Sequence, residues 1–286
     1  MKQLFLGLKK FAIILFVVIS CFFVCYEKNN YAKAVDLPNA FVLRGQFSTD
    51  YNKSTAERKH NVSLATKAIN GFFLEKNAEF SFNSVVGERT TRRGYKMAKT
   101  IFNGKFVDGV GGGVCQVSTT LYNAVLVSGL KITEYHPHSL EVSYCSPSFD
   151  AMVNSGSADL KFVNNTGMPI YIVGKANGKE VNFQIYGEKN SQKIERKSVV
   201  VGYEDVPQPE IIVDEKGEYP DLYEGETKTI SYGKKGVKSE GYLIITLPNG
   251  KKKSVKIRKD SYMAIRGIEV VGRAKKPLEE VKNQTL

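Results

Sequence analysis

The sequence is poor in two residue types on which much enzyme and metal chemistry depends. Its 286 residues contain only three histidines and four cysteines. Cys21 and Cys25 lie in an apolar run near the N-terminus, so the rest of the chain can form at most one disulfide. Any catalytic imidazole must come from His60, His136 or His138.

Charged residues are missing from the run Phe11–Tyr26, which lysines precede and Ala32-Lys33-Ala34 follows. This order is typical of a secretory signal peptide with an A-x-A cleavage site. The run has 16 residues, whereas a spanning helix needs about 20. An uncleaved membrane anchor stays open as an alternative, and Val18–Cys21 also resembles a lipoprotein cleavage site. Each interpretation of residues 1–34 predicts an extracytoplasmic protein.

Acidic residues are fewer than basic ones, and the formal net charge is +12. Residues 1–34 hold five Lys and one Glu, so the remaining chain keeps a net charge of +8. Export argues against nucleic acid as a partner and favours an anionic cell envelope. A basic surface without a specific partner is the alternative.

The rest of the composition indicates a folded protein, since 42% of the residues are hydrophobic. Residues 41–190 mix helix and strand patterns, which predicts an α+β domain. Residues 191–212 are polar and are interpreted as a connecting segment. Residues 213–273 lack a helical period and predict a small all-β domain, and the tail 274–286 is expected to be mobile.

Two main helices and an antiparallel meander are predicted in the first domain. Ser54-Thr55-Ala56-Glu57 is a capping box that starts one helix, and Asn70-Gly71 ends it. A second helix is expected from Cys115 to Ser128, before Gly129. Alternating patterns predict short strands, at 79–83, 140–144, 159–163, 169–173 and 180–186.

Cys115 is the strongest candidate for a functional residue, because it opens the second predicted helix directly after a glycine run. A helix N-terminus carries unpaired N–H groups and a partial positive charge, and both stabilise a thiolate. The glycine amides, with that of Cys115 or Gln116, could form an oxyanion hole. Hydroxyl residues share the helix face of Cys115. The predicted substrate-binding residues are therefore Gly111, Gly112, Gly113, Gln116, Ser118, Thr119 and Tyr122.

A thiolate nucleophile needs a base or cation beside it. His136 and His138 follow the helix, and residues two apart on an extended segment face the same way. His138 is favoured because it lies at the entrance of a predicted strand. Asp150, Asp159 and Glu134 are candidate acids to orient the imidazole.

Less reactive interpretations of Cys115 are open at this point. It could be a buried structural thiol or form a disulfide with Cys145. A metal site made of Cys115, Cys145, His136 and His138 is a further alternative, although this spacing is not a strong zinc pattern. The run "GVGGG" lacks the Lys-Ser/Thr of a phosphate-binding P-loop. Neither a metal nor another cofactor is expected.

The first domain resembles the VanW family over about residues 45–187. The resemblance rests on the order and spacing of several blocks, namely "FSFNSVVGERTTRRGY", "NGKFVDGVGGGVCQVSTTLYNAVLVSGL", "EYHPHSLEVSY", "DAMV" and "KFVNNTGMPIYI". Some VanW-domain proteins of Gram-positive bacteria are L,D-transpeptidases, which make 3-3 cross-links in peptidoglycan with the cysteine of the domain.

This resemblance implies roles for individual residues. Cys115 matches the family cysteine, His136 and His138 match an H-x-H-S block, and Asp150 matches a family aspartate. Two departures stand out: "PSFDAMV" lacks a usual glycine, and Cys145 replaces a usual apolar residue, which weakens the disulfide interpretation.

The C-terminal part resembles the G-five domain, a small all-β module, through Gly225, Gly233, Gly236, Gly250 and Gly272. Such domains are thought to bind N-acetylglucosamine polymers or to act as spacers. Together the resemblances imply a wall protein that performs cysteine-dependent acyl transfer on peptidoglycan. Stem peptides, glycan and anionic wall polymers are the expected partners, with the membrane if residues 1–34 stay attached. A non-catalytic wall-binding or glycopeptide-resistance accessory protein is the alternative.

Overall fold

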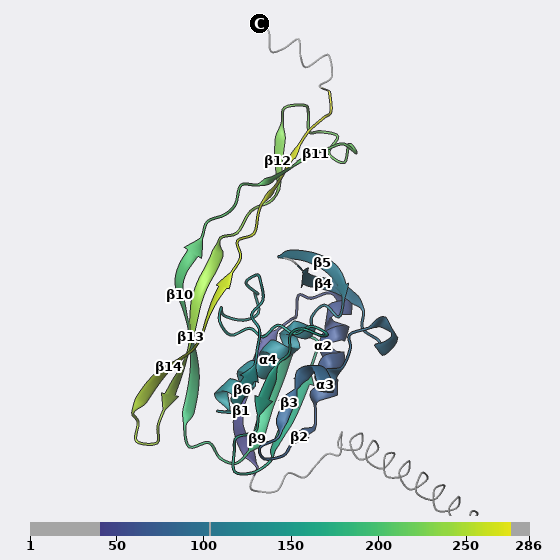
Figure 1. Ribbon diagram of the computed structural model, residues 1–286. Coiled ribbons are helices and arrows are strands. Elements are labelled where there is room, and N and C mark those ends of the chain that lie inside the picture. The colour runs from purple at the N-terminus through teal and green to yellow at the C-terminus, as the bar shows by residue number, and fades with distance from the viewer. Residues whose placement is uncertain (1–40, 103, 276–286) are drawn as a thin grey trace, which may run out of the picture.

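The computed structural model describes residues 41–102 and 104–275. The predicted signal or anchor and residues 276–286 of the tail lie outside the described residues. Within that part of the chain, no helix is long and apolar enough to cross a membrane. A body of helices and sheets lies beside a long region made only of strands (Figure 1), which confirms the predicted α+β class and the all-β C-terminal part.

A four-stranded antiparallel sheet forms the centre of the body. Its order is β1-β9-β8-β2, with bounds β1 Val42–Asp50, β2 Phe72–Leu74, β8 Ile170–Ala176 and β9 Glu180–Gly187. Two long helices pack against this sheet, α2 (Ala56–Ile69) and α4 (Val114–Val127). Buried side chains of both helices and of the sheet form one continuous hydrophobic core.

Three smaller elements complete the body. The three-stranded sheet β3-β7-β6 consists of β3 (Glu79–Ser81), β6 (Lys131–Glu134) and β7 (Lys161–Val163). The short helix α3 (Phe82–Val86) follows β3 directly. Strands β4 (Met97–Phe102) and β5 (Lys105–Val110) pair as a hairpin that leads into α4.

The ends of both long helices follow from local sequence. Thr55 is the N-cap of α2 and accepts a hydrogen bond from the Arg58 backbone N–H, so the predicted cap at Ser54 is wrong by one residue. The predicted stop is confirmed, because Asn70 caps the helix and Gly71 has φ 85°. Helix α4 lies within one residue of its predicted bounds and is followed by Gly129 with φ 75°.

Two strand predictions in the body need correction. Residues 140–144 form a loop, although Leu140 and Val142 are buried, because the alternating side chains enter the core without a neighbouring strand. The predicted strand 79–83 ends at Ser81, where α3 begins. Strand β7 pairs with β3 and β6 rather than continuing to β8, and the Phe80 and Phe162 rings stack 4.7 Å apart.

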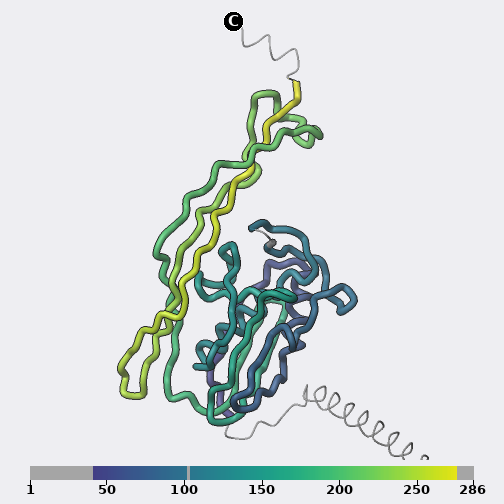
Figure 2. Tube along the Cα trace, viewed as in Figure 1, coloured from purple at the N-terminus to yellow at the C-terminus, as the bar shows by residue number. Residues whose placement is uncertain are grey.

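The C-terminal region contains two three-stranded sheets, β10-β13-β14 and β11-β15-β12. Figure 2 shows that segments far apart in sequence run side by side along this region. The bounds are β10 Lys193–Glu204, β11 Glu210–Val213, β12 Thr227–Ser231, β13 Gly236–Thr246, β14 Lys252–Tyr262 and β15 Ile268–Val271.

Strand β10 corrects the interpretation of residues 191–212 as a connection. It is a 12-residue edge strand paired along its length with β13. In the first half of the strand the exposed polar residues Lys193, Glu195 and Lys197 alternate with half-buried ones, as expected for a sheet with one face in water. That composition resembles a linker unless the alternation is recognised.

Candidate active site

Cys115 is the second residue of α4 and is only half-buried. Gly113 is the residue before the helix and has φ 108°, a left-handed conformation that favours glycine. The thiol donates a hydrogen bond to the Val153 carbonyl oxygen over 3.3 Å. The helix start therefore holds a half-buried cysteine among backbone N–H groups that favour negative charge.

The His138 imidazole lies between Cys115 and Asp150. Its Nδ1 is 2.7 Å from Asp150 Oδ2, and its backbone N–H donates to the same oxygen, also over 2.7 Å. The ring is also close enough to the Cys115 thiol for each group to change the pKa of the other. Since Nδ1 is taken by Asp150, Nε2 is the ring nitrogen left to face the sulfur. The three side chains form a cysteine–histidine–aspartate series.

Burial and neighbouring charges have opposite effects on this series. Burial opposes ionisation of Cys115, but the hydrogen bond and charge of His138, together with Arg89, bring the pKa of the thiol below its ordinary value. Burial likewise disfavours the imidazolium, but Asp150 and Cys115 raise the pKa of His138 to about 9. Both shifts favour a thiolate–imidazolium pair.

Asp150 is almost completely buried, and yet it is kept ionised. Burial tends to raise its pKa, but His138, the Arg258 charge and the Tyr262 hydroxyl hold that pKa below its usual value. The carboxylate can therefore accept hydrogen bonds on both oxygens at neutral pH.

The other histidine of the predicted pair lies elsewhere. His136 Nε2 is 3.0 Å from Glu134 Oε1, and Lys161 binds the other oxygen of that carboxylate at 2.8 Å. These two partners, Lys161 foremost, lower the pKa of Glu134 to about 2. Asp159 is bound instead by Ser81 and by the Asn83 backbone N–H. Glu134, His136 and Asp159 thus form hydrogen bonds away from Cys115.

The polar side chains of α4 are buried and hold neighbouring segments. Ser118 Oγ donates to the Ala151 carbonyl over 2.6 Å, and Thr119 Oγ1 accepts from the Ala151 N–H over 2.9 Å. Gln116 Nε2 donates to Thr49 and to the Asp50 carbonyl. Tyr122 is 1% exposed, and burial raises its pKa to about 12. The face of α4 that was predicted to bind substrate is therefore packed against the rest of the body.

The glycine run lies close to backbone on several sides. Gly111 N–H donates to the Lys96 carbonyl, and the Gly112 carbonyl accepts from Asn61 Nδ2 over 3.0 Å. A Cβ on Gly112 would lie 2.6 Å from the Lys99 carbonyl oxygen. The Gln116 N–H already donates to Gly113. These contacts explain why the run consists of glycines.

Cys115 and Cys145 are both free thiols, so the structure contains no disulfide between them. Cys145 donates to the Phe149 carbonyl and lies near Asn123, and burial raises its pKa. The residues described contain no group of three or more His, Cys, Asp or Glu side chains placed to hold a metal ion.

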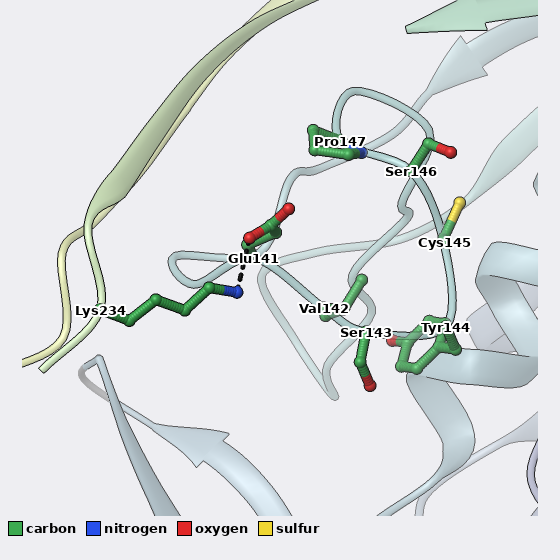
Figure 3. Close-up of a pocket in the computed structure, with 8 residues that line it drawn as sticks. All are labelled: Glu141, Val142, Ser143, Tyr144, Cys145, Ser146, Pro147 and Lys234. Atoms are coloured by element: carbon green, nitrogen blue, oxygen red, sulfur yellow. Dashed lines mark hydrogen bonds and ion pairs between the residues drawn. The ribbon is translucent and has the colours of Figure 1, made fainter. Parts of the chain in front are cut away.

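A pocket of about 450 Å³ lies beside the site. The loop 141–147 and Lys234 of the C-terminal region line it, and Lys234 bridges to Glu141 at 2.6 Å (Figure 3). Tyr144 lines this pocket and is also close enough to Cys115 and Asp150 for their charges to act on its hydroxyl. Burial raises the pKa of Tyr144 well above its usual value, and the charges of Cys115 and Asp150 add to that effect.

Comparison with known families identifies the body. Residues 57–186 match the family model described as VanW like protein. This range contains Cys115, His138 and Asp150, and thus the whole series. The chain has a VanW-like domain.

Two relatives share this part of the chain. "Uncharacterized protein YoaR" of Bacillus subtilis (strain 168) is 44% identical over 142 residues, which are 50% of this chain and 47% of the relative. "Vancomycin B-type resistance protein VanW" of Enterococcus faecalis (strain ATCC 700802 / V583) is 28% identical over 164 residues, 52% of this chain and 59% of the relative. The chain thus spans about half the length of these curated relatives.

Two solved structures match part of the chain. The G5 domain of HP0197 covers 29% of this chain at 18% identity, with all of its own length aligned and a TM-score of 0.16. The G5 domain of an IgA1 protease covers 30% of this chain at 21% identity, with 96% of its own length aligned and a TM-score of 0.19.

Three residues around the VanW-like domain's site were missed by sequence reasoning. Arg89, which lies in a quoted VanW-like block, is bound to Asn83, and its charge acts on Cys115. Arg258 and Tyr262 come from β14 and bind Asp150. Arg89 could have been suspected from its block, whereas nothing in the local sequence connects β14 with the site.

Proposed function

We propose that this protein is an extracytoplasmic cysteine acyltransferase that forms 3-3 cross-links between peptidoglycan stem peptides, in the manner of an L,D-transpeptidase. The observation that carries the proposal is the series Cys115–His138–Asp150 at the start of α4. A lowered thiol pKa beside a raised imidazole pKa is what a nucleophilic cysteine requires.

The first half-reaction follows from this arrangement. The Cys115 thiolate attacks the carbonyl carbon of the third stem residue, and the electron pair of that carbonyl moves to its oxygen. The N–H of Cys115 at the positive end of α4 stabilises the oxyanion. When the tetrahedral species collapses, the C–N bond to the terminal D-alanine breaks. His138 gives its proton to the departing amine, which leaves a thioester on Cys115.

The second half-reaction uses the neutral imidazole as a base. An amine on a neighbouring stem attacks the thioester carbonyl, and His138 Nε2 takes the proton that this amine loses. The C–S bond then breaks and restores the thiolate–imidazolium pair. Water in place of the amine would give hydrolysis, so the same residues also support carboxypeptidase activity.

Positive charge near Cys115 suits such a substrate. The Arg89 charge favours negative charge at the sulfur. Arg58 lies beside the glycine run and donates to Gln116 Oε1 over 2.8 Å. A donor stem ends in a carboxylate, and guanidinium groups bind carboxylates well. The export signal predicted from the sequence and the net positive charge support a site of action at the anionic wall, with residues 1–34 as a signal peptide or a membrane anchor.

Mass spectrometry of the purified protein incubated with a disaccharide-tetrapeptide tests this proposal. We expect an acyl adduct on Cys115, or a 3-3 linked dimer in solution, with wild-type protein. Cys115→Ala should give neither. Cys145→Ala is the matched control, since it removes the other described thiol, and it should behave as wild type.

The same experiment also distinguishes acyl transfer from the main alternative, a non-catalytic protein. Cross-linking that persists in Cys115→Ala would contradict the mechanism. Without adduct or product, and with slow alkylation of Cys115, the protein would be a non-catalytic peptidoglycan-binding or resistance accessory protein. In that case the start of α4 would bind a stem carboxylate as other helix N-termini bind anions.

A further inference from the structure

The acid that orients His138 is held by a different part of the chain. Asp150 lies in the VanW-like domain, and strand β14 of the C-terminal region supplies two side chains to it. The Tyr262 hydroxyl donates to Asp150 Oδ1 over 2.6 Å. Arg258 Nη2 lies 3.3 Å from the same oxygen, and Nη1 donates to the Asp150 backbone carbonyl over 2.6 Å.

The two oxygens of the Asp150 carboxylate have different partners. Oδ2 accepts both hydrogen bonds from His138, whereas Oδ1 accepts from Tyr262 and Arg258. A carboxylate bound on both oxygens cannot rotate without losing charge-assisted hydrogen bonds. The direction of Oδ2 toward His138 therefore depends on residues more than a hundred positions away in the sequence.

Arg258 is itself fixed on several sides. Its Nε and Nη2 bind Asp260 at 2.7 and 3.1 Å, and its guanidinium lies 4.5 Å from the centre of the Tyr135 ring. Arg258 is 4% exposed. A buried guanidinium between two carboxylates with paired geometry is rigid, unlike a surface ion pair.

The same strands also hold the loops on either side of the site. Ser148, two residues before Asp150, has φ 62°, and its N–H donates to the Tyr262 hydroxyl over 2.7 Å. Its Oγ lies 2.7 Å from Ser239 Oγ on β13. The Met263 N–H donates to the Ser139 carbonyl, next to His138. The C-terminal sheet thus contacts the chain beside both His138 and Asp150.

We propose that Arg258 and Tyr262 are positioning residues for the thiol of Cys115, so that the C-terminal sheet completes the active site of the VanW-like domain. They act through Asp150 and His138 and do not touch the substrate. This inference rests on the proposed function for its meaning, but it makes a statement about thiol reactivity that needs no substrate. The test below follows the pH dependence of Cys115, so the ionisable groups around Asp150 have to be named. They are His138, Cys115, Tyr122, Tyr144, Arg258, Asp260 and Tyr262.

The test is the rate of Cys115 alkylation by iodoacetamide as a function of pH, followed by peptide mass spectrometry on the whole purified protein. Tyr262→Phe removes one hydroxyl and keeps the ring. We expect alkylation at pH 7 to slow about tenfold, with the midpoint of the pH profile about one unit higher. Tyr232→Phe is the matched control, because Tyr232 is 88% exposed, and its profile should equal that of wild type.

A structural role alone gives a different result. Partial unfolding changes the amount of native protein but does not move the pH midpoint of the molecules that remain folded. Arg258→Lys, which keeps the charge and loses the planar fork, should move the midpoint in the same direction as Tyr262→Phe. Tyr262→Phe still decides the question if Arg258→Lys does not fold.

Asp150→Asn separates this inference from the proposed function. A shifted midpoint in both Asp150→Asn and Tyr262→Phe supports both. A shift in Asp150→Asn with a wild-type profile in Tyr262→Phe overturns the positioning role and leaves the Cys115–His138–Asp150 series unchallenged. A wild-type profile in Asp150→Asn contradicts the role of Asp150 in that series. It overturns the positioning role as well, even if Tyr262→Phe slows alkylation by another route.

Discussion

At the scale of single residues, the structure distinguishes two histidines that the sequence leaves equivalent. His136 and His138 are two positions apart, and each has a carboxylate partner. The partner of His136 is the surface carboxylate Glu134, whereas His138 is buried between Asp150 and Cys115. Burial strengthens the interaction between charges, so only the second imidazole can tune a thiol strongly.

Substitution of each histidine by glutamine tests this difference. In His138→Gln the thiolate loses its cationic neighbour, and desolvation then raises the pKa of Cys115. Alkylation of Cys115 at pH 7 should slow by about tenfold or more, since each pKa unit changes the thiolate fraction tenfold. His136→Gln should leave the rate within about twofold of wild type. Equal slowing in both variants would contradict the assignment of His138.

In the wild-type protein, Cys115 alkylation and acyl transfer should depend on pH in different ways. Alkylation needs only the thiolate, so its rate should rise through the lowered pKa of Cys115 and then level off. Acyl transfer also needs the His138 proton for the leaving amine, so it should fall as pH passes about 9. Above about pH 9 we therefore expect acyl transfer to slow while alkylation stays at its plateau, because only acyl transfer needs protonated His138.

Sequence reasoning proposed Cys115, His138 and Asp150 as nucleophile, base and orienting acid, and the structure brings these three side chains together. It misassigned Ser118, Thr119 and Tyr122, because a helix wheel separates polar from apolar faces only when one face is exposed. Helix α4 is buried on nearly every side, so its hydroxyl groups bind the backbone of residue Ala151 and other neighbours. Arg258 and Tyr262 could not be found, because only the tertiary fold brings β14 to the site.

At the scale of elements, the start of α4 is held by α2. The Asn61 side chain on α2 donates to the carbonyls of Lys96 and Gly112 and accepts from the Lys96 N–H. One fully buried amide therefore fixes both the residue that precedes β4 and the glycine run that follows β5. The position of Cys115 depends on this arrangement, because Gly113 is the residue from which the helix begins.

Gly112→Ala tests how tightly this element is packed. The added Cβ would meet the Lys99 carbonyl oxygen at 2.6 Å and the Ala98 carbonyl group at 2.8 Å, and backbone atoms cannot move aside as a flexible side chain would. We expect the free energy of unfolding in urea to fall by about 1–3 kcal/mol. Gly202→Ala, whose Cβ would find its first neighbour at 3.9 Å, is the control and should change stability little. Equal stability of the two variants would show that the glycine run is not under steric constraint.

The elements that sequence predicts well are those whose signals are local. Caps and glycines define the ends of α2 and α4, and Asn177-Gly178 defines the turn between β8 and β9. The loop 140–144 and strand β10 were misread because their outcome depends on a partner. An alternating pattern becomes a strand only if another strand lies beside it, as β13 does for β10.

At the scale of the whole molecule, the VanW-like domain and the C-terminal sheet share buried contacts beyond the site. Leu243 and Ile257 of the sheet pack against the hydrophobic core of the body. Arg196 of β10 donates to Asn123 over 2.5 Å and lies 4.7 Å from the centre of the Phe149 ring. Contacts of this kind predict that the two parts unfold together, because neither can separate without exposing buried charge.

A side chain inserted between the two parts tests this coupling. A Cβ on Gly241 of β13 would lie 2.8 Å from the Ser148 carbonyl oxygen and 3.1 Å from Arg258 Cγ, so Gly241→Val forces the sheet away from the loop that carries Asp150. We expect wild type to unfold in one transition in urea, seen alike by circular dichroism and by protection of Cys115 from alkylation. In Gly241→Val the protection of Cys115 from alkylation should be lost at a lower urea concentration than the circular dichroism of the strands. The reason is that separation of the sheet from the loop frees Asp150 before the strands unfold. Gly202→Val on the neighbouring strand, where the nearest atom is 3.9 Å away, should keep the two signals together. Coincident transitions in Gly241→Val would mean that the sheet does not hold the site in place.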